Sequence, residues 1–183
     1  CGGVDNIFPH HTNEIAQSES YLGHKWCNYW FHILHLNTNS GKMSKSKGEF
    51  LTVSLLESKG YDPLVYRFFC LQSHYRKSLV FTYENLDNAK TAYNKLTARI
   101  AQLMANKKPD EVVELEDFEK FKGSFKAALD DDINTSNAIT VLYDVLKADT
   151  NNETKLALIE DFDKVLSLGL IEAAKKLSAD GEE

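Results

Sequence analysis

The segment Lys42-Met43-Ser44-Lys45-Ser46 decides how this chain is organised, and it follows the turn-forming residues 37–41. An apolar and aromatic run, residues 30–36, precedes it, and a helix-capping residue, Thr52, follows it. The two ammonium groups and the serine hydroxyls can offset charge that develops on phosphate oxygens, so Lys42 and Lys45 are candidate catalytic residues. The alternative is a solvated basic loop, because short runs of Lys and Ser are common in loops.

Length and composition narrow the class of protein. The 183 residues are enough for one ordinary domain or two small ones, and the hydrophobic share of 43% supports a packed core. No apolar run approaches the roughly 18 residues of a membrane-spanning helix, and the first residues do not resemble a signal peptide. The three cysteines form no CxxC pair, which favours a reducing compartment. We therefore expect a cytoplasmic protein with no membrane partner.

The net charge of −6 is unevenly distributed along the sequence. Residues 42–108 carry twelve lysines and arginines against five acids, a net charge of +7. Residues 109–183 carry eight against nineteen, a net charge of −11. A chain of this kind can hold a polyanion at its basic middle and repel it elsewhere, although ordinary variation between segments gives the same pattern.

The residues Gly2-Gly3-Val4-Asp5 predict a tight turn near the start of the chain. Paired glycines let a backbone approach a ligand closely, and a carboxylate just after such a turn can accept hydrogen bonds from ribose hydroxyls. Gly3 and Asp5 are therefore candidate nucleotide-binding residues. A Gly-Gly turn followed by Asp also occurs as an ordinary chain reversal that binds no ligand.

A helix is predicted from Pro9 to about Tyr21, with Gly23 as its stop signal. His10 and Glu14 would then lie four residues apart on one helical face. An imidazole nitrogen and a carboxylate oxygen so placed can supply two of the four ligands of a tetrahedral Zn2+ site. The alternative is an ordinary pair on a helix surface.

The aromatic and apolar run Asn28–Leu36 predicts a strand buried on both faces, as in a parallel sheet inside an α/β layer. We expect His32 and His35 within it to be pocket or core residues rather than metal ligands.

The remainder of the chain predicts helices with short connections, and apolar side chains at helical spacing indicate an antiparallel bundle. Local start and stop signals predict a short helix from Thr52 or Ser54 to Gly60 and a helix at about 64–72 that is capped by Asp62, with Pro63 at its first position. Further helices are predicted at about 83–106 and 116–129, from Asn134 or Thr135 to about 147, and from Asn151-Asn152 to about 168, where Gly169 stops the last one.

Several motifs occur together in one order and spacing. They are Gly2-Gly3-Val4-Asp5, Phe8-Pro9-His10-His11, Asn28-Tyr29-Trp30, Lys42–Ser46, Ser73-His74-Tyr75-Arg76 and Asp130–Thr135. In this combination the chain resembles the cysteinyl-tRNA synthetases, a family of class I aminoacyl-tRNA synthetases. The resemblance covers most of the chain.

The resemblance implies ATP-dependent activation of cysteine, with Mg2+ accompanying ATP, and transfer of the cysteine to tRNA(Cys). His10 and Glu14 match two of the four Zn2+ ligands that bind the cysteine thiolate in that family. Lys45 matches the ATP-contacting lysine of a mobile loop, and Gly3 and Asp5 match the turn beside the nucleotide ribose. Zn2+ suits amino-acid selection here because a thiolate is a softer ligand than the serine hydroxyl.

Parts of the family pattern are absent from this sequence. The first signature, of the His-x-Gly-His type, and two cysteine ligands of Zn2+ lie upstream in that family, and Cys1 falls at neither ligand position. Two ligands alone hold Zn2+ poorly. We therefore expect an internal fragment of the enzyme that is inactive by itself.

The expected fold is mostly α and has three parts. Residues 1–50 would be the tail of a Rossmann-like α/β catalytic domain, residues 51–82 a linking region of short helices, and residues 83–183 an antiparallel helical bundle of the tRNA-binding type. Three cations of the bundle, Lys90, Lys95 and Arg99, would face either tRNA or solvent.

Two other functions are compatible with the sequence. One is a related ligase that joins cysteine to an amino-sugar, and the other is a non-catalytic helical module that binds tRNA or another partner. The long helical match that reaches Asp130–Thr135 favours the tRNA enzyme over the amino-sugar ligase. Binding of tRNA that weakens with salt, without ATP turnover, would favour the non-catalytic module.

Overall fold

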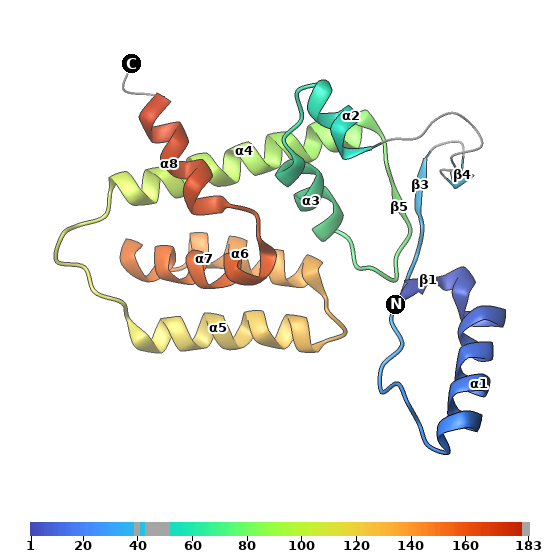
Figure 1. Ribbon diagram of the computed structural model, residues 1–183. Coiled ribbons are helices and arrows are strands. Elements are labelled where there is room, and N and C mark those ends of the chain that lie inside the picture. The colour runs from blue at the N-terminus through green and yellow to red at the C-terminus, as the bar shows by residue number, and fades with distance from the viewer. Residues whose placement is uncertain (39–40, 43–51, 181–183) are drawn as a thin grey trace. The chain divides into compact units, whose positions relative to one another are not determined.

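A computed structural model describes residues 1–38, 41–42 and 52–180 of the chain. These residues are mostly helical, as predicted, with short strands confined to the N-terminal part and to one later segment (Figure 1). They form two compact units, of which the first comprises Cys1–Phe50 with Tyr75–Thr82 and the second Leu51–His74 with Tyr83–Glu183.

Among its described residues, the N-terminal unit contains one α-helix, a short 3-10 helix at Val4–Asn6 and five short strands. Helix α1, Thr12–Leu22, follows a π-helical turn at Ile7–His11, and its C-terminus is closed by Gly23 at a φ of 71°. This confirms the helix predicted from Pro9 to about Tyr21, because a left-handed residue after the last turn is the usual place for glycine.

The strands of this unit form two small sheets. Strand β1, Gly2–Gly3, pairs in parallel with β2, His32–Ile33, with Gly2 opposite His32. The second sheet has the order β4-β3-β5, in which β3, Leu36–Thr38, lies between β4, Gly41–Lys42, and β5, Leu79–Val80. Strand β3 pairs in parallel with β5 and antiparallel with β4.

The prediction of one doubly buried strand over Asn28–Leu36 is wrong. The segment contains β2 and the first residue of β3, and several of its large side chains are exposed, including Tyr29 at 91% and Ile33 at 43%. Its aromatic residues instead make ring contacts, such as Phe31 with Tyr75 at 4.2 Å between centroids. A high apolar content therefore reflects local aromatic packing here rather than a continuous strand.

The helical unit begins with two short helices that start at the predicted caps. Helix α2, Val53–Ser58, is capped by Thr52, whose hydroxyl accepts a hydrogen bond from Leu55 N at 3.1 Å. Helix α3, Pro63–Leu71, is capped by Asp62, whose carboxylate accepts from Leu64 N at 2.7 Å. Both bonds satisfy backbone donors that the first helical turn leaves unpaired.

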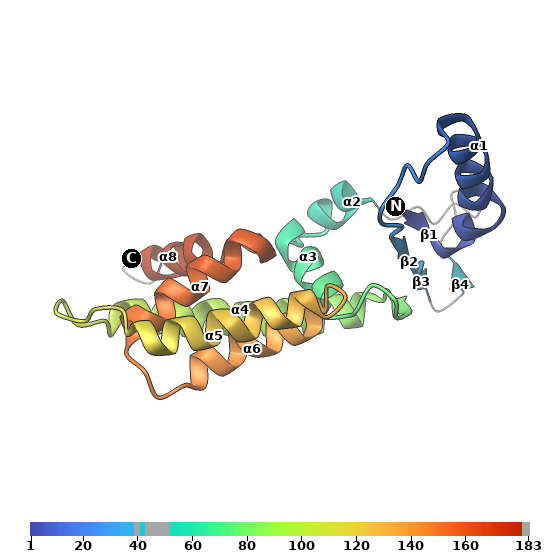
Figure 2. The same ribbon diagram turned by 90° about the horizontal axis from the view of Figure 1, so that it is seen from below.

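Five further helices complete this unit: α4, Tyr83–Ala105; α5, Leu115–Asp130; α6, Thr135–Lys147; α7, Asn152–Leu166; and α8, Leu170–Asp180. Helix α4 packs against α3 and α8, and α5 packs against α6 and α7. Figure 2 shows α4, α5 and α6 aligned along one direction, which agrees with the predicted bundle.

The core of the helical unit is apolar and continuous across these helices. Phe125 of α5 stacks on Phe162 of α7, with 4.0 Å between ring centroids and 7° between planes. Side chains that are at most 1% exposed include Phe68, Leu86, Leu96, Ile100, Leu142, Val145, Leu158, Ile159, Leu166, Leu168 and Leu170. Burial of apolar area on this scale is the main stabilising contribution in such a bundle.

Helix α8 was not predicted, since residues 151–168 were expected to form the last helix. Gly169, interpreted as a stop signal, is a single left-handed residue with a φ of 64° between α7 and α8. Ser167 also adopts a positive φ, and the carboxylate of Asp163 accepts hydrogen bonds from Leu168 N at 2.6 Å and Leu170 N at 2.9 Å. The chain therefore turns sharply and begins another helix.

The two compact units exchange neighbouring segments of the chain. Residues 75–82 lie with the N-terminal unit because β5 pairs with β3, whereas α2 and α3 pack with the helical unit. None of the helices in the described part of the chain is both long enough and apolar enough to cross a bilayer.

Candidate functional site

The tight turn predicted at the two glycines is a 3-10 turn, Val4–Asn6, that directly follows them, since Gly2–Gly3 itself is strand β1. Gly3 and Asp5 lie together with a third residue, His35. The Asp5 carboxylate oxygen Oδ1 lies 3.2 Å from His35 Nε2. A Cβ added at Gly3 would come within 2.4 Å of Asp5 Oδ1 and 2.8 Å of His35 Cε1, so a side chain at this position would displace both groups. Glycine is required here because the backbone passes so close to this pair.

The candidate Zn2+ ligands lie on the surface of the same unit. His10 belongs to the turn before α1, Glu14 belongs to the first turn of α1, and both side chains are exposed. Within the described ranges, no group of three or more His, Cys, Asp and Glu side chains is placed to hold a metal ion. His10 and Glu14 are thus two donors of suitable chemistry rather than a complete coordination set.

A pair of histidine rings lies beside these residues. His11 Nδ1 is 2.7 Å from His32 Nε2, and the His11 ring also contacts Trp30 at 4.7 Å between centroids. Trp26 packs edge-on against Trp30 at 5.8 Å. The contact between the two nitrogens requires one ring to donate and the other to accept.

Electrostatics favour the neutral form of His32. Its pKa is lowered below the ordinary value of 6.5, chiefly by desolvation, with further contributions from the charges of His11, the N-terminal amine and Arg76. Each of these effects disfavours a positive charge on the His32 ring.

A cavity of about 270 Å3 adjoins the histidine pair. Its lining comes from three separated segments of the chain and consists of Val4, Ile7, Trp30, His32, Leu34 and Arg76. This confirms the expectation that His32 is a pocket residue. His35 instead pairs with Asp5.

Sequence reasoning did not single out His11 or Arg76 for this cavity. Successive helical residues point in different directions, and the ring of His11, next to His10 in the sequence, lies against that of His32. Arg76 lies in a motif, Ser73–Arg76, that resembles the family but for which no role was deduced. Its position in the cavity depends on the pairing of β5 with β3, which is not evident from local sequence.

The two candidate lysines lie at the edge of what the structure describes. The backbone of Lys42 forms part of β4, opposite Asn37. Lys45, like most of the segment Lys42–Ser46, lies outside the described residues.

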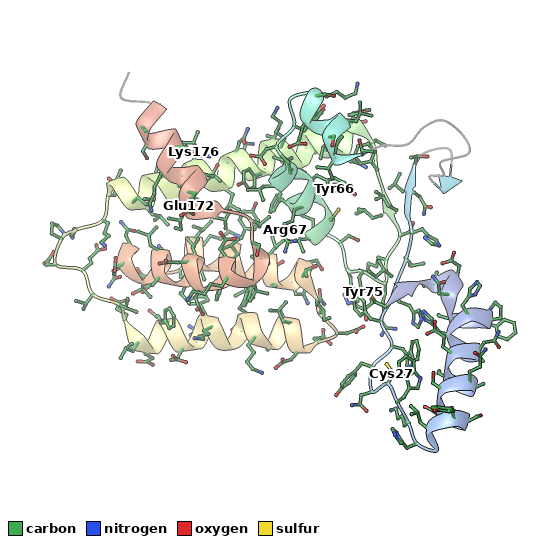
Figure 3. The ribbon with its side chains drawn as sticks, viewed as in Figure 1. Cys27, Tyr66, Arg67, Tyr75, Glu172 and Lys176 are labelled. Atoms are coloured by element: carbon green, nitrogen blue, oxygen red, sulfur yellow. The ribbon has the colours of Figure 1, made fainter. Side chains whose placement is uncertain are left out.

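Two cationic side chains of α4 make hydrogen bonds to backbone carbonyls of the helical unit. Arg99 Nη2 donates to Leu146 O at 2.8 Å. Lys90 Nζ donates to Gly60 O at 3.4 Å and lies 5.3 Å from the centroid of the Tyr61 ring. Arg67 of α3 similarly reaches the end of α7, where its Nε donates to Leu166 O at 2.6 Å (Figure 3). Arg99 and Lys90 therefore have structural partners.

Two known protein families match most of the chain between them. Residues 1–91 match the family described as tRNA synthetases class I (C) catalytic domain, and residues 124–170 match the DALR domain. The chain belongs to the class I tRNA synthetase (C) family. Its N-terminal unit, with the cavity and the His10–Glu14 pair, lies within the catalytic-domain match. Helices α6 and α7 lie wholly within the DALR match.

Individual members of this class I family are similar over nearly the whole chain. "Cysteine--tRNA ligase 1" of Burkholderia lata is 40% identical over 174 residues, which cover 94% of this chain and 35% of that protein. "Cysteine--tRNA ligase" of Borrelia turicatae is 40% identical over 181 residues, covering 93% and 38%, and that of Clostridioides difficile is 40% identical over 174, covering 91% and 37%. The chain therefore spans little more than a third of the length of these relatives.

Proposed function

We propose that this chain is part of a cysteine–tRNA ligase, which activates cysteine with ATP and transfers it to tRNA(Cys) in the cytoplasm. The observation that supports the proposal is the 40% identity to proteins of that name, which extends through both units rather than through the cavity region alone. Attack of the cysteine carboxylate on the α-phosphate of ATP would give the adenylate and release pyrophosphate.

In this proposal the N-terminal residues contribute one part of the active site. Gly3 and Asp5 would lie beside the ribose of ATP, and Lys42 and Lys45 would neutralise its phosphates together with Mg2+. The described pairing of Asp5 with His35 holds that carboxylate at a fixed place beside the backbone of Gly3. Residues 1–50 would form the end of the catalytic domain, residues 51–82 a link, and residues 83–183 the bundle that contacts tRNA.

The same proposal assigns two Zn2+ ligands to this chain. His10 and Glu14 fit by chemistry, since an imidazole nitrogen and a carboxylate oxygen one helical turn apart are both ordinary Zn2+ donors. Both are exposed and so accessible to ligands from another part of a longer polypeptide. When bound, Zn2+ would hold the substrate thiolate and so distinguish cysteine from serine.

The decisive test is cysteine-dependent exchange of pyrophosphate into ATP by a polypeptide that contains this sequence and has the length of the relatives. We expect exchange with cysteine and a much slower exchange with serine, followed by charging of tRNA(Cys). Exchange that leads to cysteine on an amino-sugar acceptor instead would identify the alternative ligase. The 183-residue chain is expected to show no exchange, and exchange by that chain would refute the need for additional residues.

Substitutions at the proposed Zn2+ ligands separate their role from helix stability. His10→Ala and Glu14→Gln should each lower bound zinc and raise the KM for cysteine at least tenfold in the longer enzyme. Asn13→Ala is a matched control because Asn13 is also exposed and lies between them on α1. Equal zinc content in all three variants would remove His10 and Glu14 from the site.

A further inference from the structure

The cavity of the N-terminal unit contains one permanent positive charge, that of Arg76, among its lining residues. Of the other five, Val4, Ile7 and Leu34 are apolar, and His32 is biased toward its neutral form. None of the six described lining residues is acidic. An anion that entered this space would therefore meet a cation and no lining carboxylate.

Arg76 is held in this unit through its neighbour Tyr75. The carbonyl of Tyr75 accepts a hydrogen bond from Leu34 N at 3.0 Å, and the Tyr75 ring packs on Phe31 at 4.2 Å (Figure 3). Three residues after Arg76 the chain enters β5, which pairs with β3. The backbone that carries the guanidinium is thus fixed on both sides of the residue.

The guanidinium itself is oriented by the phenol of Tyr75. Arg76 Nε lies 3.0 Å from the Tyr75 hydroxyl oxygen, and the guanidinium carbon lies 5.3 Å from the ring centroid. A guanidinium held in this way presents the planar, forked donor group that binds carboxylates and phosphates. The charge of Arg76 also contributes, after desolvation and other neighbouring positive charges, to the lowered pKa of His32.

We propose that Arg76 is a substrate-binding residue, which holds an oxyanion of the bound substrate in the cavity beside Trp30 and His32. The ligand is a small molecule with a carboxylate or phosphoryl group. The proposal rests on the proposed function to the extent that the amino acid carboxylate and the ATP phosphates are the two natural sources of that group.

The test uses the fluorescence of the two tryptophans of the 183-residue chain. Trp30 lines the cavity, and Trp26 packs against Trp30. The chain is titrated at fixed ionic strength with sodium pyrophosphate, ATP, L-cysteine and cysteine methyl ester. We expect a saturable change in emission with at least one of the anions. A response to pyrophosphate and ATP indicates a phosphoryl site, and a response to cysteine but not to its ester indicates a carboxylate site.

Variants then assign the effect to Arg76. Arg76→Gln should weaken binding about tenfold or more, and Arg76→Lys, which keeps the charge and loses the fork, should lie between that variant and the parent chain. Lys77→Gln is the matched control, because Lys77 is the next residue and is exposed like Arg76, but it does not line the cavity. Loss of its charge should change binding less than about twofold. Unchanged tryptophan emission without ligand verifies that each variant is folded around the cavity. If Arg76→Gln does not fold, Arg76→Lys is compared with the parent chain instead.

Three results would overturn the proposal: no saturable response of the parent chain to any of the anions, equal binding by Arg76→Gln and the parent chain, or equal losses in Arg76→Gln and Lys77→Gln. The proposed ligase function fails on a different measurement, namely absence of pyrophosphate exchange in the longer enzyme. Anion binding by the short chain without exchange by the long one would keep Arg76 as a binding residue and reject the ligase.

Discussion

The rings of His11 and His32 make a contact that depends on the protonation of their nitrogens. The 2.7 Å separation of their ring nitrogens is a hydrogen bond only while one nitrogen keeps a lone pair. The pKa of His32 is lowered by desolvation and by neighbouring positive charge, so the neutral ring is the form that the fold favours. The pair is therefore intact at neutral pH and sensitive to acid.

The consequence for pH is that the N-terminal unit should lose stability as pH falls below about 6.5, the ordinary pKa of histidine. The unfolded chain takes up a proton on His32 at a higher pH than the folded chain does, so acid favours unfolding until the folded pKa is passed. Thermal unfolding followed by tryptophan emission between pH 8 and pH 5 measures this effect. His32→Gln should flatten the dependence, and an unchanged slope in that variant would contradict the assignment to His32.

A second residue, Asp163, connects α7 to α8. Its two carboxylate oxygens accept from Leu168 N and Leu170 N, and each of these backbone donors lies beside a fully buried leucine side chain. Asp163→Ala should lower the free energy of unfolding of the helical unit by about 2–3 kcal/mol, because two charge-assisted bonds to partly buried donors are lost. Asp163→Asn keeps one acceptor oxygen, so its free energy of unfolding should lie between those of the parent chain and Asp163→Ala.

Urea unfolding followed by circular dichroism at 222 nm measures these differences. Asp144→Ala is the control, since Asp144 is an exposed acid on α6 and should change stability by less than about 0.5 kcal/mol. Equal losses for Asp163→Ala and Asp144→Ala would show that the two hydrogen bonds contribute little.

At the scale of elements, the turn from α7 to α8 also depends on a backbone conformation. Gly169 has a φ of 64°, and a Cβ added there would lie 3.1 Å from Leu64 Cδ1 of α3. Gly169→Ala should therefore destabilise the helical unit by about 1–2 kcal/mol. Gly123→Ala is the matched opposite, because Gly123 lies inside α5 with nothing within 4 Å of the new Cβ, and it should stabilise by about 0.5–1 kcal/mol.

The signs of the two glycine substitutions are the test. Both variants remove one glycine and add one methyl group, so any general effect of the substitution is shared. Thermal unfolding of the two variants in one buffer gives the comparison. A stabilised Gly169→Ala would show that the turn relaxes to a different backbone conformation.

Most helices could be predicted from sequence because their start signals are local. Thr52, Asp62, Asn134 and Asn151 cap α2, α3, α6 and α7 as predicted, each with its side-chain oxygen on a backbone N–H of the first turn. Helix α8 was missed because Gly169 is equally typical of a helix end and of a sharp turn between two helices. The repeat of Leu170, Ala174 and Leu177 along α8 was the signal that would have revealed it.

The candidate site could be predicted only in part. Gly3 and Asp5 do lie together, but their partner His35 comes from a segment that was assigned to a buried strand. His32 was expected at a pocket, whereas the cavity also needs Arg76, which reaches it through long-range strand pairing. Periodicity and capping describe neighbours along the chain, and these contacts join residues that are far apart in it.

At the scale of the molecule, the two units have very different cores. Among the described residues of the N-terminal unit, Phe81 is the one buried apolar side chain, whereas the helical unit contains the rest of the buried set. Since buried apolar area is the main source of stability, the N-terminal unit should unfold at a lower denaturant concentration than the helical unit.

The sequence offers a direct way to measure both transitions. Trp26 and Trp30 are the two tryptophans of the chain and belong to the N-terminal unit, while most of the helical signal comes from the other unit. The urea midpoint from tryptophan emission should precede the midpoint from circular dichroism at 222 nm. Coincident midpoints would show that the chain unfolds as one cooperative body.

The order in which the chain visits its two units has a consequence for its synthesis. The chain leaves the N-terminal unit before α2, builds α2 and α3, and returns at Tyr75 to place β5 beside β3. A ribosome therefore releases β3 well before its parallel neighbour exists, and the edge that β5 will cover stays available throughout that interval. The nascent chain can finish its first unit only after part of its second has already emerged.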